Sequence, residues 1–153
     1  MITGTVVGGE ALIERFESLP NRLRAELRVG IARACLLVQR ETKESKLTGQ
    51  VLNVRSGRLR RSINMRITEE PDQVTGIVGT NVSYARAHEF GFDGTVNVRE
   101  HLRRTVSGKF AIVHSHGRHM HLPERSFLRS ALKDMTAEIR AEFEQAAHRA
   151  LTP

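Results

Sequence analysis

Apolar residues recur at helical spacing in two long stretches of the chain. In residues 22–46 a single apolar stripe is opposed by arginines, lysines and glutamates, and the stripe consists of Leu23, Leu27, Ile31, Ala34, Cys35 and Val38. In residues 123–150 apolar residues repeat at every fourth position, namely Phe127, Ala131, Met135, Ile139 and Phe143. Each pattern predicts a long amphipathic helix whose apolar face packs on a sheet or on another helix.

Two shorter elements are predicted before these helices. Residues 2–7 are rich in β-branched side chains and end at two glycines, which predicts a first strand. Residues 10–19 have helical spacing, and Pro20 is expected to end that helix because proline has no backbone N–H to donate.

Alternation of apolar and polar residues predicts strands in the middle of the chain. Residues 58–68 alternate, residues 69–72 form a turn, and residues 73–80 supply a second strand. Residues 47–57, which precede them, are interpreted as a polar connection. The two strands make a predicted hairpin, with one face for the long helix to cover.

Residues 82–91 lie between two glycine-containing breaks and predict a short helix of one or two turns. His88 and Glu89 stand side by side within it, as an acid–base pair would. Neighbouring side chains on a helix point about 100° apart, however, so the two groups do not converge on one substrate atom. We therefore expect no catalytic role for them.

Two further extended segments, residues 95–106 and 109–122, are joined by a Ser-Gly turn. This hairpin is polar for its length, so we expect it to project from the body instead of filling the core. The predicted fold is α+β: a mainly antiparallel sheet packed by two long helices, with a projecting β-hairpin arm. The whole chain is predicted to be a single domain, with the arm at residues 95–122.

Composition narrows the class of protein. The chain has 153 residues, a net charge of +7, 39% hydrophobic residues and 5% aromatic residues. So lean a core indicates oligomerisation or segments ordered by a partner, and the charge indicates an acidic partner. The single cysteine, Cys35, excludes an internal disulfide, and the longest apolar run, residues 34–38, is far short of the ~20 residues that span a membrane. We expect a soluble protein made in the cytoplasm, with no membrane partner.

Five arginines follow one another without an intervening acid; they are Arg55, Arg58, Arg60, Arg61 and Arg66. Arginine binds phosphate through paired hydrogen bonds, so this run is a candidate contact with duplex DNA or with an acidic rim of a neighbouring subunit. A solvated strand edge is the simpler alternative. Because no aromatic residue lies among the arginines to stack on bases, sequence-specific recognition is not expected.

Four histidines form a His-x-His-x-x-His-x-His pattern; they are His114, His116, His119 and His121. On a strand these make two pairs, each sharing a face, as zinc or nickel ligands would. Structural zinc sites usually include cysteine, however, and no carboxylate lies close by in the sequence. The chain also lacks a nucleophile in a glycine elbow and a phosphate-binding loop. We expect no metal, no cofactor and no catalytic residue.

Three blocks carry a resemblance to a known family. They read Ser56-Gly57-Arg58-Leu59-Arg60-Arg61-Ser62-Ile63, then Tyr84-Ala85-Arg86-Ala87-His88-Glu89-Phe90-Gly91, then Leu122-Pro123-Glu124-Arg125-Ser126-Phe127-Leu128-Arg129-Ser130-Ala131-Leu132. In this order they resemble the neck or tail-completion proteins of tailed bacteriophages and prophages, whose pattern is Thr/Ser-Gly-x-Leu-x-x-Ser-Ile, Tyr-Ala-x-x-x-Glu-Phe-Gly and Arg-Pro-Phe-Leu-x-x-Ala-Leu. Ser126 stands where proline is commoner, and only some members carry the long arm.

The resemblance implies a small α+β virion subunit that assembles as a homo-oligomeric ring where head and tail join, beside other neck and tail proteins. It implies structural roles for the motif residues Gly57, Leu59, Ser62, Tyr84, Ala85, Glu89, Phe90, Gly91, Phe127 and Leu128. Tyr84 and Phe90 would be buried, and Glu89 would pair with an arginine.

The function predicted from the sequence is therefore a structural one, in the virion of a tailed phage or prophage. A basic duplex-DNA-binding module, acting in DNA packaging or regulation, is the alternative, and non-specific contact with duplex DNA is compatible with both. A histidine-metal enzyme is a third, weaker reading.

Overall fold

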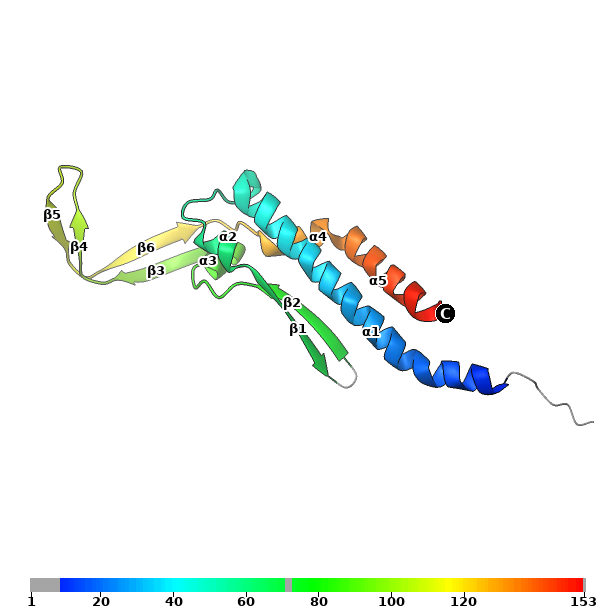
Figure 1. Cartoon of the computed structure of the whole chain (residues 1–153). Helices are drawn as coiled ribbons and strands as arrows, with labels where there is room; N and C mark the ends of the chain where they lie inside the picture. Colours follow the sequence, from blue (N-terminus) through cyan, green and yellow to red (C-terminus); the bar gives the residue numbers. More distant parts are fainter. Residues whose placement is uncertain (1–8, 71–72, 153) are drawn as a thin grey trace, which may run out of the picture.

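A computed structural model describes residues 9–70 and 73–152, with side chains from Pro20 onward. The strand predicted at residues 2–7 and the centre of the turn predicted at residues 69–72 lie outside the described residues. Figure 1 shows a body built on one long helix, from which a narrow β-ribbon extends.

The long helix, α1 (Gly9–Glu41), runs through Pro20 without ending there, so the predicted stop was wrong. Proline's fixed φ is itself helical, and the ring removes only one hydrogen bond from the ladder. The helix continues into a wider-wound segment, η1 (Thr42–Gln50), whose backbone leaves helical geometry at Leu47 and Thr48. Gly49, at φ 128°, completes the exit near the predicted boundary.

The predicted hairpin is present, but it begins later than expected. Strands β1 (Asn64–Glu70) and β2 (Gln73–Gly79) pair antiparallel, with Met65 opposite Val78 and Ile67 opposite Gly76. This face packs on α1, as predicted. Residues 58–62 of the predicted strand form instead a short helix, α2 (Arg58–Ser62).

The core lies where η1 meets α2, α3 (Ala85–Phe90) and the chain just before α4 (Leu128–Asp134). Its buried members are Leu47, Leu52, Ile63, Val82, Ala85 and Phe127. Leu47 and Leu52 belong to the segment that we interpreted as a polar connection, and they are among its most buried residues. The connection therefore contributes to the core.

A buried lysine, Lys46, ties η1 to α4. The Lys46 ammonium donates hydrogen bonds to Asp134 and, at 2.7 Å, to Gln50, and it lies 3.5 Å from Glu41. The hydrogen bond to Asp134 raises the pKa of Lys46 against the opposing effect of burial. The positive charge of Lys46 is tolerated in this buried position because these three side chains surround its ammonium group.

The predicted second long helix is two helices, α4 (Leu128–Asp134) and α5 (Thr136–Leu151), separated at Met135. Four residues turn a helix through about 400°, which is about 40° more than one full turn. Over the four steps from Phe127 to Phe143, the stripe on one straight helix would therefore rotate by about 160° around the helix axis. The break lets both ends of the stripe face the body. Helix α5 packs closely on α1, where Gly30 leaves room for Ala146.

The second predicted hairpin forms the projecting ribbon in Figure 1. Strand β3 (Phe92–Val98) pairs with β6 (His116–Leu122), and beyond a bend β4 (His101–Arg104) pairs with β5 (Phe110–Val113). We call residues 92–122 the arm and residues 99–114 the arm tip. The described strands thus make three separate two-stranded antiparallel sheets, and the predicted α+β class is confirmed.

The contact between β2 and α1 can be tested at a glycine. A Cβ at Gly76 would lie 2.4 Å from the Cys35 sulfur and 2.7 Å from Ile31 Cγ2. We predict that Gly76→Ala pushes the hairpin off α1 and lowers the free energy of unfolding by about 1–3 kcal/mol in chemical denaturation. Gly79→Ala, on the same strand with nothing within 4 Å, is the matched control and should be nearly neutral. Equal effects of the two substitutions would contradict this packing.

Candidate assembly site: the arm, its base and the arginine surface

Glu89 lies at the point where the arm leaves the body, and only 4% of its surface is exposed. Its carboxylate accepts hydrogen bonds from the backbone N–H groups of Phe127, Leu128 and Arg129 at 2.8–2.9 Å. These donors surround the start of α4, so a residue distant in sequence caps that helix. The Ser126 hydroxyl adds a fourth hydrogen bond at 3.1 Å.

Two opposing effects set the pKa of Glu89. Burial raises it, while the N–H groups at the start of α4 and the Ser126 hydroxyl lower it, and the net pKa is lowered. The carboxylate therefore remains charged at neutral pH. It has the predicted arginine partner, since Arg129 Nε lies 3.2 Å from Glu89 Oε1.

Arg129 joins both ends of the arm. Its guanidinium also donates to the Glu89 carbonyl at 2.8 Å and to Glu124 at 2.7 Å, and it lies 4.6 Å from the centre of the Phe90 ring. Gly91, at φ 75°, brings the start of β3 so close to the end of β6 that a Cβ there would lie 3.1 Å from the Leu122 carbonyl oxygen. Both strands are thus fixed to one cluster of residues. We call this cluster, which consists of Glu89, Phe90, Gly91, Glu124 and Arg129, the arm base.

Two motif residues differ from what the resemblance implied. Tyr84 is 40% exposed and Phe90 is 59% exposed, so the expectation that both are buried was wrong. Phe90 lies instead beneath the Arg129 guanidinium, and Tyr84 makes an edge contact with His88. The anchoring apolar side chain is Phe127, which is fully buried.

The first motif block shapes α2. Gly57 precedes the helix at φ 70°, and Leu59 packs against the core. The Ser62 hydroxyl donates to the Leu59 carbonyl at 2.8 Å and lies 2.6 Å from the Thr80 hydroxyl, which links α2 to the end of β2. Together with Ala85, Gly91 and Leu128, the motif residues gather around the core and the arm base.

The arginine run is only partly a cluster. Arg55, Arg58, Arg60 and Arg61 are exposed and surround two adjoining hollows of about 610 and 720 Å³, whereas Arg66 lines neither. Within the described ranges none of the five arginines forms an ion pair. The structure adds Lys43 and Arg125 to the rims, which spacing in the sequence could not show. We call the four clustered arginines the arginine surface.

The histidines lie along the exposed face of the arm. Asp93, across the ribbon, is 3.0 Å from His121 and 3.2 Å from His119, and Glu100 is 3.1 Å from His114. Carboxylates that are distant in the sequence therefore lie beside three of the four histidines, because strand pairing brings them there. No group of three or more histidine, cysteine, aspartate or glutamate side chains among the described residues is placed to hold a metal ion.

The comparison with known families decides the broad identity. Residues 32–152, which include the arm, its base and the arginine surface, match the phage virion morphogenesis family. The chain belongs to the phage virion morphogenesis family. No curated protein and no solved structure gives a significant match.

Membership of the virion morphogenesis family confirms the resemblance read from the three blocks and gives the chain a virion-associated role. Among the described helices, none has the length and apolar character needed to cross a bilayer. The surfaces described above are accordingly candidate contacts in an assembly.

The arm base makes a pH-dependent prediction. Because the folded-state pKa of Glu89 is lowered, its contribution to stability is present above the unfolded value of about 4.3 and is lost as the pH falls through the folded pKa. We predict that Glu89→Gln, which turns an acceptor oxygen into an N–H₂ donor facing other donors, costs about 1–3 kcal/mol of unfolding free energy at pH 7.

Denaturation curves at pH 7 and at pH 3 would measure this, and the difference from the native protein should shrink at the lower pH. Glu124→Gln removes an exposed ion pair to the same Arg129 and is the matched control. It should cost no more than about 1 kcal/mol. A pH-independent loss in Glu89→Gln would contradict the capping role of the charge.

Proposed function

We propose that the protein is a structural subunit of the neck or tail-completion ring of a tailed phage or prophage. The observation that carries the proposal is the arm, whose main contacts are between its own strands and whose base is fixed to the body by Glu89 and Arg129. A ribbon held firmly at one end and uncovered at the other suits contact with a neighbouring subunit. Membership of the virion morphogenesis family supports this reading.

The proposal involves no catalytic step, cofactor or metal. The side chains at the arm base bond to one another and to the start of α4, which is a structural arrangement. Other neck and tail proteins are the expected partners in addition to further copies of the chain.

The arginine surface supports a second role within the same assembly. Its guanidinium groups are exposed and lack acidic partners in the described part of the chain, so they are available to DNA phosphates or to carboxylates of a neighbouring subunit. Phosphate contacts without base contacts would let any DNA sequence pass through a channel.

The same arginines favour the alternative function, a basic duplex-DNA-binding module acting in packaging or regulation.

Native mass spectrometry and negative-stain microscopy of the purified chain test the ring, which should appear as a closed particle with a single number of subunits. Fluorescence anisotropy with a random duplex tests the alternative. A chain that stays monomeric and binds the duplex with a steep loss of affinity in salt would overturn the ring proposal.

The ring proposal predicts different roles for members of the arginine surface. We predict that Arg58→Lys and Arg61→Lys lower ring stability, because lysine cannot reproduce the paired hydrogen bonds of a guanidinium at a subunit interface. Arg66→Lys, outside the arginine surface, is the control and should leave the ring unchanged. Ring dissociation against salt concentration, followed by mass photometry, is the measurement. Full stability of both variants at every salt concentration would leave only a point-charge role, such as lining a DNA passage.

A further inference from the structure

The arm tip exposes a row of large apolar side chains. Leu102 is 66% exposed, Phe110 71% and Ile112 59%. Leu102 pairs with Ile112, and Phe110 lies two residues before Ile112, so the three share one face of the β4–β5 ribbon. Two four-residue strands with an apolar face open to water are marginally stable without a covering layer. A surface outside the tip that covered this face would stabilise the ribbon.

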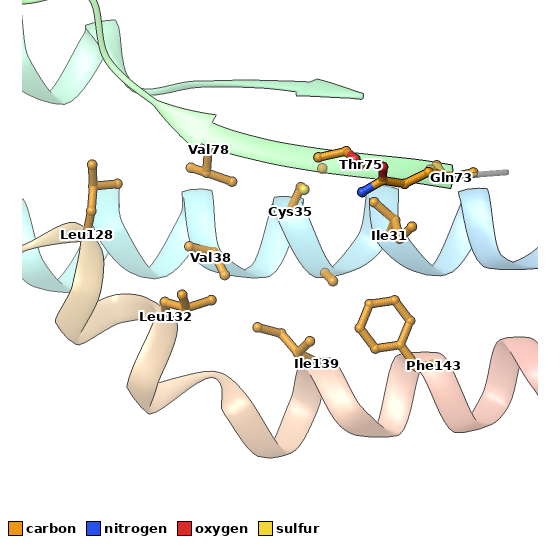
Figure 2. Close-up of a pocket in the computed structure, with 13 residues that line it drawn as sticks. Ile31, Cys35, Val38, Gln73, Thr75, Val78, Leu128, Leu132, Ile139 and Phe143 are labelled. Carbon is orange, nitrogen blue, oxygen red and sulfur yellow. The ribbon is translucent and has the colours of Figure 1, made fainter. Parts of the chain in front are cut away.

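The body has an apolar groove of about 430 Å³ that no described segment fills. Figure 2 shows α1 as its floor, β2 as one wall and α4–α5 as the other, with Val38, Leu132, Ile139 and Phe143 pointing into it. A second hollow of about 350 Å³ continues it along α1 and shares Ile31 as a lining residue. Leu132 and Phe143 are exposed, so this groove also lacks a covering layer.

The arm tip and helix α5 carry net charges of opposite sign. The arm tip carries Arg99, Arg103, Arg104 and Lys109 against the single acid Glu100. Helix α5, a wall of the groove, carries three glutamates against two arginines, in a chain of net charge +7. Glu138 and Glu144 on α5 make no ion pair within the described residues. The same holds for the arginines and the lysine of the tip, whereas its single acid, Glu100, faces His114. Opposite charges on two such surfaces steer their encounter and fix their register.

We propose that the arm tip of one copy docks in the groove of a neighbouring copy. The occupant comes from a second copy because the arm extends away from the body that carries its own groove (Figure 1). One contact of this kind covers both apolar surfaces, and each subunit is at once donor and acceptor. Such head-to-tail contacts form a ring when their rotation closes. The inference rests on the proposed ring only for the closure of these contacts into a circle. What it adds is the identity of the two surfaces that form the subunit interface.

Disulfide trapping tests the contact directly. In a Cys35→Ala background, one chain carries Ile112→Cys on the tip and a second carries Leu132→Cys in the groove. Docking raises the effective concentration of the two thiols, so the mixed chains should form about tenfold more cross-linked heterodimer than a mixture in which Leu36→Cys replaces Leu132→Cys. Leu36 is an exposed α1 residue that does not line the groove, which makes it the matched control.

The possible outcomes distinguish a failure of the docking contact from a failure of the ring proposal. A ring seen by native mass spectrometry without enrichment of the Ile112–Leu132 pair would overturn the interface and leave the ring standing. If the Ile112–Leu132 cross-link is enriched but the subunits form open chains instead of rings, the docking contact is supported and the closed ring is overturned. Monomers at every concentration, without enrichment, would contradict both. A cross-link from Ile112→Cys only to another virion protein in assembled particles would also overturn the interface.

A second variant pair guards against cysteine artefacts. Phe110→Ser with Ile112→Ser removes side chains that contribute little to the fold of the isolated subunit because they are exposed. This double variant should keep the native circular dichroism and melting curve but lose assembly. Val29→Ser, at an exposed apolar position of α1 outside the groove, should assemble normally. Unimpaired assembly of the double variant would overturn the docking contact.

Discussion

The arrangement of the molecule depends on the hydrogen bonds that the Glu89 carboxylate accepts at the start of α4. This carboxylate satisfies three backbone N–H groups at the start of α4 that have no partner within the helix, and it does so from α3, on the far side of the arm in the sequence. Phe127, the first of these donors, is thereby held in the core. The single carboxylate thus fixes the start of the C-terminal helices, the closure of the core and the origin of both arm strands.

Periodicity in the sequence was enough to predict the fold class, the two helical regions, the first hairpin and the arm. The prediction failed where the spacing of apolar residues fits both a strand and a helix, and where an apolar stripe rotates around the helix axis. Leu59 and Ile63 are four residues apart, which fits both an alternating strand and one face of a helix. The chain forms a short helix there, with Gly57 in a left-handed conformation just before it and Ile63 just after it. Likewise the strict four-residue repeat around Met135 concealed a helix break, because a straight helix could not keep that stripe on one side.

The candidate site was predictable to the extent that its residues lie together in the sequence. The arginine run was found from local spacing, and the pairing of Glu89 with an arginine was implied by the family resemblance. The donors to Glu89 were not predicted, because backbone N–H groups carry no sequence signal and lie nearly forty residues away. Asp93 was missed as a histidine partner for the same reason, since only the register of β3 against β6 brings them together. The apolar tip did leave a signal, in Leu102, Phe110 and Ile112, within a segment interpreted as polar.

Fastening both arm strands to one cluster has a mechanical consequence. A partner that pulls on the tip puts tension on β3 and β6 together, and both strands enter the body beside Arg129 and Glu89. The Glu89 hydrogen bonds to α4 then carry the force side by side, so that several must rupture at once instead of one after another. The pull passes from there through Phe127 into the core, which makes the subunit resist extraction by its arm more strongly than a ribbon tethered at one strand would.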